Sequence, residues 1–211
     1  MDAQKYTLAI SPQDPEWPAM IETTDIPDLL IYKRETFSDN RGFFREAIEL
    51  RDLEKVLGKK IEITQWNHSM SVPKVIRGFH AEPWEKLIYV TRGQAMSVIV
   101  DLRTDSPTFG KTVKIILGEN DRKTVYLPKG MGNSFCNIGD TDLEYLYLIT
   151  GYFEGLPTPA ISWQDPLLTK QFGGWPIPDP IVSEKDMSYP TLKEVFGDKV
   201  DFTQFPWLTE N

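Results

Sequence analysis

"KLIYVTRGQAMSVIVDLR", residues 86–103, reads as two β-strands joined by a tight turn at Arg92-Gly93. Side chains alternate across a strand, so one face of the second half carries Met96, Val98, Val100 and Leu102. A strand with such an apolar face packs against a core. The stretch therefore predicts a β-sheet architecture.

Further extended segments flank this stretch. They are IEITQWN (61–67), KTVKIILG (111–118), KTVYLP (123–128) and LEYLYLIT (143–150). Turns rich in Pro, Gly and Asp separate such runs at intervals of roughly 8–12 residues, which is typical of an all-β sandwich or barrel. Helical spacing is confined to short segments, LRDLEKVLG (50–58) and YPTLKEVFG (189–197), each of which ends on a glycine.

The two ends of the chain differ from this central region. We expect residues 1–25 to form an arm without regular structure, because they contain Pro12, Pro15 and Pro18. Residues 157–190 are rich in Pro and Trp, and we expect an ordered loop that wraps the barrel. The tail carries Phe202, Phe205 and Trp207. It is too apolar to stay in water, so it should dock on its own domain or on a partner subunit.

Composition limits the function classes. The chain has 211 residues and a net charge of −8, which argues against nucleic acid or an anionic membrane as the main partner. No apolar run approaches the ~20 residues of a membrane span, and the polar N-terminus lacks the apolar core of a signal peptide. A single cysteine, Cys136, excludes an internal disulfide framework. These features predict a soluble cytoplasmic protein.

The chain has only two histidines, His68 and His80. A catalytic metal site needs about three protein ligands, mostly His and carboxylate. Metal-binding β-barrels of this type place two histidines close together, but His80 is followed by Ala81 and Glu82, and His68 lies on a different segment. We therefore expect no metal and no other cofactor.

Nine stretches, in order along most of the chain, resemble the dTDP-4-dehydrorhamnose 3,5-epimerase family of RmlC-like cupins. They are IPDLLIYKRETFSDNRGFFRE (26–46), TQWNHSMS (64–71), VIRGFH (75–80), KLIYVTRG (86–93), VDLRTDSPTFG (100–110), LPKGMGNSF (127–135), YLYLITGYF (145–153), SWQDP (162–166) and SEKD (183–186). The combination of RGFH with VDLRTDSPTFG in this order is the most specific feature.

The resemblance implies an all-β fold, a cupin-type jelly-roll β-barrel with a few short helices and a C-terminal tail. On this basis we divide the chain into an N-terminal arm (1–25), a jelly-roll epimerase domain (26–166) and a wrapping segment of the same domain (167–211). The family works without metal. Its members are usually dimers, which implies a homodimer with strand exchange and shared active sites.

The implied reaction inverts C3 and C5 of a 4-keto-6-deoxy sugar carried on dTDP. Both carbons are α to the ketone, so removal of their protons gives a carbanion that delocalises onto the C4 oxygen. Catalysis therefore needs a base on one face of the sugar, an acid on the other face, and positive charge near the developing enolate.

The resemblance assigns these roles to four residues. His80 is the base, Asp186 orients it and stabilises its imidazolium, Tyr147 is the acid on the opposite face, and Lys86 lies near the C4 oxygen. The alternatives are a structural histidine, a solvated acid and a core tyrosine. Asp165 in SWQDP competes with Asp186 and is assigned to turn structure, and Tyr145 is assigned to the core.

The nucleotide-sugar contacts implied by the resemblance are more numerous. They fall on Arg77, Arg41, Glu46, Gln65, Asn67, Asn133 and Phe153. Arg77 is expected to act as a charge clamp, and Phe153 to stack on the base, which is worth ~1–3 kcal/mol. In the family the segment around Arg41 often serves the neighbouring subunit's site.

The sequence also departs from the family pattern. Asn133 stands where the family has a substrate-contacting histidine, and Thr158 stands where it has a glutamate. Ala81 and Glu82 replace an aromatic residue and an amide. These changes leave open which nucleotide is bound and whether one carbon or two are epimerised. The alternatives are a single-site C3 or C5 epimerase, a 3,4-ketoisomerase, and a sugar-nucleotide-binding barrel without catalysis.

Overall fold

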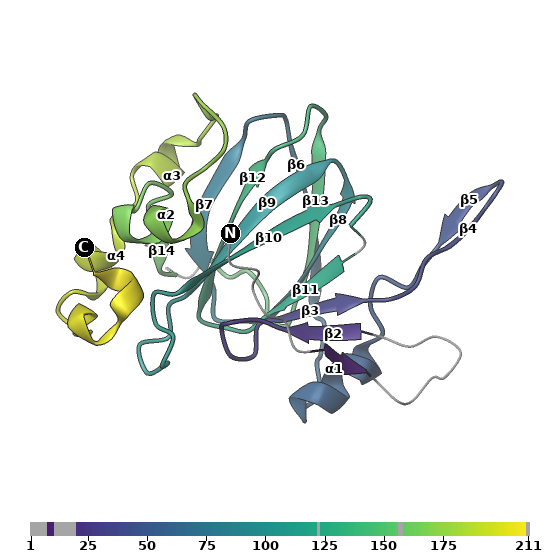
Figure 1. Cartoon of the computed structure of the whole chain (residues 1–211), viewed down its shortest axis with the longest axis horizontal. Helices are drawn as coiled ribbons and strands as arrows, with labels where there is room; N and C mark the ends of the chain where they lie inside the picture. The colour runs from purple at the N-terminus through teal and green to yellow at the C-terminus, as the bar shows by residue number, and fades with distance from the viewer. Residues whose placement is uncertain (1–7, 11–19, 122, 156–157, 210–211) are drawn as a thin grey trace.

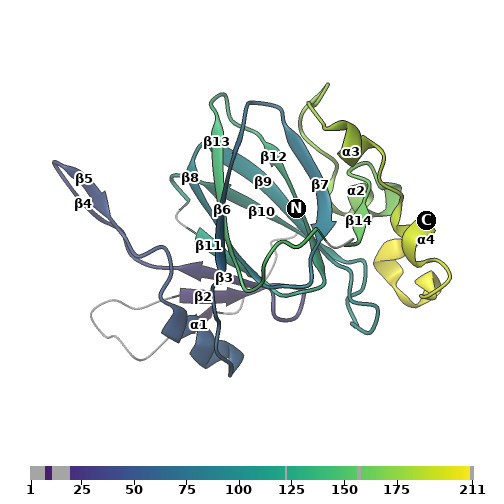
Figure 2. The ribbon, with the colours of Figure 1, turned by 180° about the vertical axis from the view of Figure 1, so that it is seen from behind.

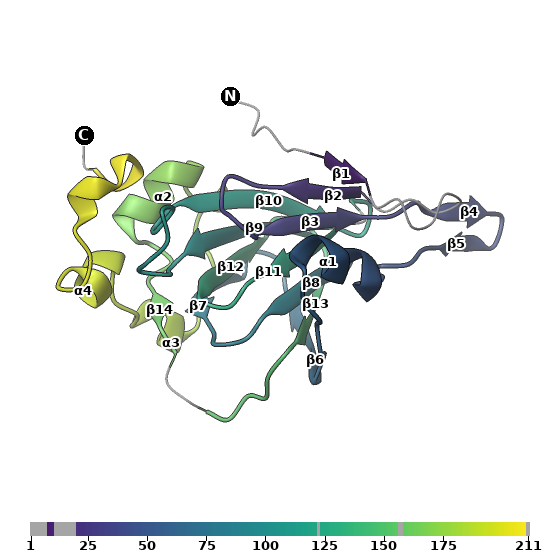
Figure 3. The ribbon, with the colours of Figure 1, turned by 90° about the horizontal axis from the view of Figure 1, so that it is seen from below.

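The computed structural model describes residues 8–10, 20–121, 123–155 and 158–209. These residues form two antiparallel sheets that face each other, and a separate hairpin that extends from them (Figure 1; Figure 3). The prediction of an all-β, jelly-roll fold is confirmed.

The two sheets and the hairpin use fourteen strands among the described residues. The seven-stranded sheet contains, in spatial order, β1 (Leu8–Ile10), β2 (Met20–Thr23), β3 (Leu30–Lys33), β11 (Lys123–Leu127), β8 (Lys86–Arg92), β13 (Leu143–Ile149) and β6 (Gln65–Ser71). The five-stranded sheet contains β10 (Thr112–Gly118), β9 (Gln94–Asp101), β12 (Met131–Asn137), β7 (Ile76–Ala81) and β14 (Ala160–Ile161). The hairpin is β4 (Phe37–Asp39) and β5 (Gly42–Phe44).

Apolar side chains from both sheets fill the space between them. This interior core includes Ile88 and Val90 of β8, Ile99 of β9, Val125 of β11 and Tyr145 of β13. Burying side chains of this size contributes roughly 1.5–3 kcal/mol each relative to leaving them exposed. The alternation seen in the sequence therefore places one face of each strand toward the other sheet.

The segment 86–103 forms two strands as predicted, but they do not pair with each other. Strand β8 pairs with β11 and β13, and β9 pairs with β10 and β12. Because both edges of β8 are already hydrogen-bonded, the chain crosses at Gly93 to the opposite sheet. Gly93 has a φ of 78°, and a Cβ there would lie 2.7 Å from the carbonyl oxygen of Asp142. The tight turn is therefore a sheet-to-sheet corner and not a hairpin.

The N-terminal arm contains regular structure, contrary to the prediction. Strand β2 pairs with β3, and β1 pairs with β2, so both extend the seven-stranded sheet. The edge of β3 offers backbone partners to β2, and the far edge of β2 offers them to β1. The three prolines themselves lie outside the described residues.

Short helices flank the barrel. They are α1 (Leu50–Leu57), α2 (Pro166–Phe172), α3 (Glu184–Met187), α4 (Leu192–Phe196) and the 3₁₀ turns η1 (Phe202–Gln204) and η2 (Pro206–Leu208). The predicted helices α1 and α4 are confirmed, and Gly58 ends α1 in the left-handed conformation. The expectation of a loop over 157–190 is wrong in part, because this region contains α2 and α3. Asp165 and Ser183 cap these helices, each accepting a hydrogen bond from a first-turn backbone N–H.

The C-terminal helices cover the outer face of the five-stranded sheet (Figure 1; Figure 2). A second core forms there between Phe79 and Val98 of the sheet and Leu168 and Leu192 of the helices. The tail joins this core, since Leu208 is buried and the indole N–H of Trp207 donates to the Phe109 carbonyl at 2.9 Å. The tail therefore docks on its own domain. Among the helices of the described ranges, none has the length and apolar character needed to cross a membrane.

Candidate active site

Strand register brings most of the predicted site residues to one end of the barrel. Tyr147 packs against the interior core, and by alternation Lys86 shares the inward face of β8 with Ile88. Direct cross-strand neighbours lie on the same face of a sheet. Asn67 is opposite Tyr147, so it also faces inward.

The remaining residues of this end follow from the same registers. Ile149 of β13 is opposite Gln65 of β6 on one side and Lys86 of β8 on the other. These two side chains therefore flank β13. In the other sheet, Asn133 of β12 is opposite His80 of β7. The two sheets therefore present His80 and Asn133 on one wall and Lys86, Tyr147, Asn67 and Gln65 on the other.

His80 is held by a carboxylate from a distant part of the chain. Its Nε2 lies 2.7 Å from Oδ1 of Asp186, which is 5% exposed. Burial alone would raise the pKa of the Asp186 carboxyl, but hydrogen bonding and charge from His80, together with the Gly78 N–H, hold this pKa below its usual value. The carboxylate is therefore ionised near neutrality and stabilises a positive charge on the imidazole.

The helix that supplies Asp186 is short and closely placed. Ser183 caps α3 by accepting a hydrogen bond from the Asp186 N–H at 3.0 Å. A Cβ added to Gly78 would lie 3.2 Å from Oδ1 of Asp186, so glycine at this position lets the carboxylate approach β7. The Tyr189 ring meets the His80 ring edge-on, with centroids 5.6 Å apart. The orientation of His80 is thus set by α3 and the residues after it.

Lys86 and Tyr147 form a second group on the opposite wall. The Lys86 ammonium lies 5.5 Å from the centroid of the Tyr147 ring and makes an ion pair with Glu82. Burial lowers the pKa of Lys86, and the Glu82 charge acts against this shift. The pKa of Tyr147 is raised, chiefly by burial and then by the charge of Glu82. Tyr147 therefore keeps its proton at neutral pH and is suited to donate it.

Asn133 lies beside His80 on the neighbouring strand, and Arg77 lies farther along the same wall. The Arg77 guanidinium donates to Ser71 Oγ at 3.1 Å and to the Met70 carbonyl at 3.0 Å. The Asn133 side-chain oxygen accepts from Ser97 Oγ at 3.3 Å and from the Tyr145 hydroxyl at 3.4 Å. These bonds fix the amide of Asn133.

Tyr145 and Asp165 take the structural positions expected for them. The Tyr145 ring is buried and stacks on Phe135 with centroids 4.1 Å apart. Asp165 is buried and accepts hydrogen bonds from the N–H groups of Leu168 and Leu192, so it links α2 to α4. Neither side chain contacts His80, and the choice of Asp186 over Asp165 agrees with this geometry.

Gln65, Asn67 and Phe153 form a group at the rim. The Gln65 amide donates to Asn67 Oδ1 at 2.6 Å, and Gln65 Oε1 accepts from the Phe153 N–H at 3.4 Å. The exposed Phe153 ring meets Trp84 edge-on, with centroids 6.5 Å apart. Trp84 was not among the predicted site residues. Its one sequence signal is that it lies close after Ala81 and Glu82, where the resemblance to the family breaks.

Arg41 and Glu46 are not brought to this group within one chain. Arg41 is in the β4–β5 turn, its side chain is 86% exposed, and it pairs with Asp39 of the same hairpin. This hairpin extends away from the barrel on the side opposite α3 (Figure 1; Figure 2). Glu46 makes an ion pair with Arg34, which also binds Asp52 at 2.9 Å.

The two histidines have separate partners. His68 lies 3.6 Å from Glu144 on the outer face of β6 and β13, whereas His80 pairs with Asp186. Across 8–10, 20–121, 123–155 and 158–209, no three His, Cys, Asp or Glu side chains are grouped so as to hold a metal ion. The expectation of a reaction without metal remains a prediction.

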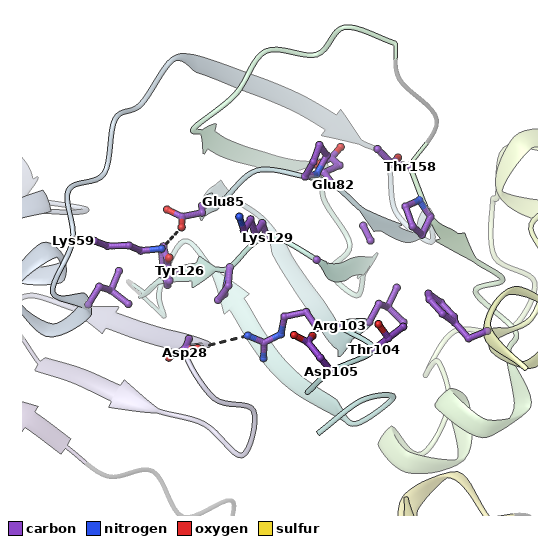
Figure 4. A pocket seen from close by; sticks show the side chains of 18 residues that line it. Asp28, Lys59, Glu82, Glu85, Arg103, Thr104, Asp105, Tyr126, Lys129 and Thr158 are labelled. Carbon is purple, nitrogen blue, oxygen red and sulfur yellow. Dashed lines mark hydrogen bonds and ion pairs between the residues drawn. The ribbon is translucent and has the colours of Figure 1, made fainter. Parts of the chain in front are cut away.

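A pocket of about 970 Å³ opens beside this site. Glu82 and Thr158 line one side of it, and Lys59, Glu85 and Arg103 line other parts (Figure 4). Its charged side chains are largely paired with each other, for example Lys59 with Glu85 and Arg103 with Asp28. Glu82 thus stands between this pocket and the buried Lys86.

Comparison with known proteins identifies the family. Residues 23–194 match the family model described as dTDP-4-dehydrorhamnose 3,5-epimerase. The chain belongs to the dTDP-4-dehydrorhamnose 3,5-epimerase family. A curated member of this epimerase family from Shigella flexneri is 35% identical over 169 residues, covering 78% of this chain and 91% of the relative. The Escherichia coli K12 member is 33% identical over 177 residues, which cover 82% of this chain and 94% of the relative.

Solved structures of the epimerase family share the fold. NovW, a 4-keto-6-deoxy sugar epimerase from Streptomyces spheroides, superposes with a TM-score of 0.78 at 26% identity and covers 97% of this chain and 98% of its own. The Bacillus anthracis epimerase was solved with TDP and PPi bound. It has a TM-score of 0.74 at 32% identity, and the match covers 82% of this chain and 99% of that structure. The Legionella pneumophila epimerase was solved in complex with dTDP-4-keto-L-rhamnose. It has a TM-score of 0.75 at 29% identity, and the match covers 89% of this chain and 97% of that structure.

Proposed function

We propose that the protein converts dTDP-4-dehydro-6-deoxy-D-glucose to dTDP-4-dehydro-L-rhamnose by inverting C3 and C5. The observation that supports this reaction is the opposition of two proton-transfer groups across the barrel. His80 with Asp186 lies on the five-stranded sheet, and Tyr147 with Lys86 lies on the seven-stranded sheet. A sugar ring between them meets a base on one face and an acid on the other.

The chemistry follows from the charge of each group. His80 removes the proton from C3 or C5, and Asp186 stabilises the imidazolium that forms. The electron pair moves onto the C4 oxygen, where the ammonium of Lys86 stabilises the enolate. Tyr147 then gives its proton to the same carbon from the opposite face, and this inverts the centre. The raised pKa of Tyr147 keeps that proton available.

The nucleotide is proposed to lie at the rim. Phe153 is exposed and free to stack on a base, while Gln65 and Asn67 offer amide groups beside it. Arg77, at the other end of the site, is proposed to contact the anionic part of the substrate. The relatives solved with TDP or with dTDP-4-keto-L-rhamnose support a nucleotide sugar as the substrate class.

We also propose a cytoplasmic homodimer that shares its active sites. The β4–β5 hairpin extends from the barrel with Arg41 at its turn, where a partner's site can receive it (Figure 1). The outer face of the edge strand β6 carries Trp66, 67% exposed, and Met70, 53% exposed. An apolar sheet face of this kind is typical of a subunit interface.

Proton NMR in deuterated water tests the reaction. The protein is incubated with dTDP-4-keto-6-deoxyglucose, and we expect deuterium at both C3 and C5 together with the L-configured product. Label at one carbon alone would instead select a single-site epimerase, the alternative that Asn133 and Thr158 leave open. A binding-only barrel would shift nucleotide resonances but incorporate no label, and that result would remove the proposed activity.

A further inference from the structure

The ammonium group of Lys86 lies in an unusually buried position. The residue is 5% exposed, and its strand neighbour on one side is the buried Leu127 of β11. On the other side it faces Ile149 of β13, with the Tyr147 ring nearby. Apolar surroundings disfavour the charged form of lysine, so a nearby anion widens the pH range over which an ammonium persists here.

Glu82 supplies that anion. Its carboxylate makes the ion pair with Lys86, and of the described acidic side chains only Glu82 contributes charge and hydrogen bonding to the Lys86 environment. Glu85 is close in sequence but pairs with Lys59 on one side of the neighbouring pocket (Figure 4). Tyr147 is uncharged at neutral pH, since a phenol is ordinarily neutral there and burial raises its pKa further. Glu82 therefore stabilises the charge of Lys86.

The Glu82 carboxylate is itself held in place. The oxygen that contacts Lys86, Oε2, also accepts a hydrogen bond from the Trp84 indole N–H at 3.1 Å. The Trp84 ring lies against Gly151, where an added Cβ would be 3.0 Å from the ring, and it meets Phe153 edge-on. Glu82 thus connects the lysine to the aromatic pair at the rim of the site.

We propose that Glu82 is a positioning residue that keeps Lys86 protonated to a higher pH than the amide of the family pattern would, and that it directs Lys86 toward the C4 oxygen of the sugar. This inference rests on the proposed epimerisation, in which Lys86 stabilises the enolate. A glutamine at position 82 keeps a hydrogen-bond acceptor but removes the charge. Lys86 would then lose its proton at a lower pH, and a neutral amine stabilises an enolate poorly.

Kinetics of matched variants test this role. We expect Glu82→Gln to move the basic limb of the kcat–pH profile to lower pH, and therefore to lower kcat most strongly above neutrality. KM should change much less than kcat. Glu82→Asp retains the charge with a shorter reach, so it should keep the basic limb of the native enzyme even where kcat falls. Glu85→Gln, which removes a neighbouring carboxylate paired elsewhere, is the control and should leave kcat and its pH profile unchanged.

A second measurement does not depend on activity. The side-chain ¹⁵Nζ resonance of Lys86, assigned by its loss in Lys86→Met, is titrated in the native protein and in Glu82→Gln. We expect the titration midpoint to fall in the variant and to stay in place in Glu85→Gln. An unchanged midpoint in Glu82→Gln would overturn the inference, even with a fully active native enzyme. Absence of deuterium incorporation by the native enzyme would instead count against the proposed epimerisation alone.

Discussion

A glycine decides how closely a carboxylate approaches the proposed base. Gly78 leaves room for Asp186, whose oxygen lies 2.7 Å from His80 although the two residues are 106 positions apart in the chain. The sequence motif RGFH identifies both the glycine and the histidine, but only the packing of α3 on β7 shows why no side chain is present at position 78. At this scale the site is a set of short contacts between side chains from separate strands and helices.

Tyr147 offers a test of the proposed acid. In Tyr147→Phe the ring still packs against the interior core, while the proton donor is lost. His80 can still remove and return a proton on its own face, so deuterium should enter the substrate while net inversion falls by about 10²-fold or more. The measurement is the ratio of exchange to product formation by NMR.

Tyr89→Phe provides the matched control. Tyr89 is on the same sheet, but alternation along β8 places it on the outer face, away from Lys86 and Ile88. This variant should keep the native ratio of exchange to inversion. If Tyr147→Phe also kept that ratio, Tyr147 would have no part in the inversion.

At the scale of single elements, one buried carboxylate closes the turn between β9 and β10. Asp101 is fully buried and accepts hydrogen bonds from Arg103, Ser106 and Thr108. Burial alone would raise the pKa of Asp101, but these hydrogen bonds lower it below its usual value. A depressed native pKa means that the ionised carboxylate stabilises the fold above about pH 4 and that this contribution is lost as pH falls further through the native pKa.

The turn therefore predicts a pH-dependent stability. Asp101→Asn should reduce the free energy of unfolding by about 2 kcal/mol at pH 7. Below about pH 4 the variant should lose less stability with falling pH than the native protein does. Urea denaturation over a range of pH measures both effects. Asp105→Asn, an exposed acid in the same turn, is the comparison and should show neither change. Equal acid sensitivity of Asp101→Asn and the native protein would contradict this assignment.

A second element-scale prediction concerns the start of α2. Asp165 accepts hydrogen bonds from the N–H groups of Leu168 and Leu192, so one buried carboxylate satisfies donors of two helices. Asp165→Ala leaves both donors without this partner, and each unsatisfied group costs about 1–3 kcal/mol. The midpoint of urea unfolding should fall accordingly. Asp198 is exposed, so Asp198→Ala should leave the midpoint of urea unfolding unchanged within experimental error. An equal effect of both variants would rule out the capping role of Asp165.

At the scale of the whole molecule, the two walls of the site come from different sheets, and the β4–β5 hairpin lies outside both. If Arg41 serves the partner's site, each active site combines His80 of one protomer with Arg41 of the other. A heterodimer of Arg41→Ala and His80→Asn then contains one site with both residues intact and one with both substituted. We expect it to recover about half of the native activity, because one of its two sites is complete.

Co-expression with two affinity tags gives the heterodimer for this measurement. The two parent homodimers, each lacking one residue at both sites, are the controls and should have little activity. A heterodimer no more active than its parents would show that Arg41 does not act across the subunit boundary.

Local patterns in the sequence predict an all-β class, the helices α1 and α4, and the strands β6, β8, β9, β10, β11 and β13. The candidate set of His80, Asp186, Tyr147 and Lys86 came from the resemblance to the family. Alternation, capping glycines and motif spacing are local signals, so they are readable along the chain. Tertiary structure alone decided that β8 and β9 belong to opposite sheets, that β1 and β2 join the sheet, and that Glu82 faces Lys86. These features depend on which backbone edges are free and which side chains share a face, and such contacts form only when distant segments pack together.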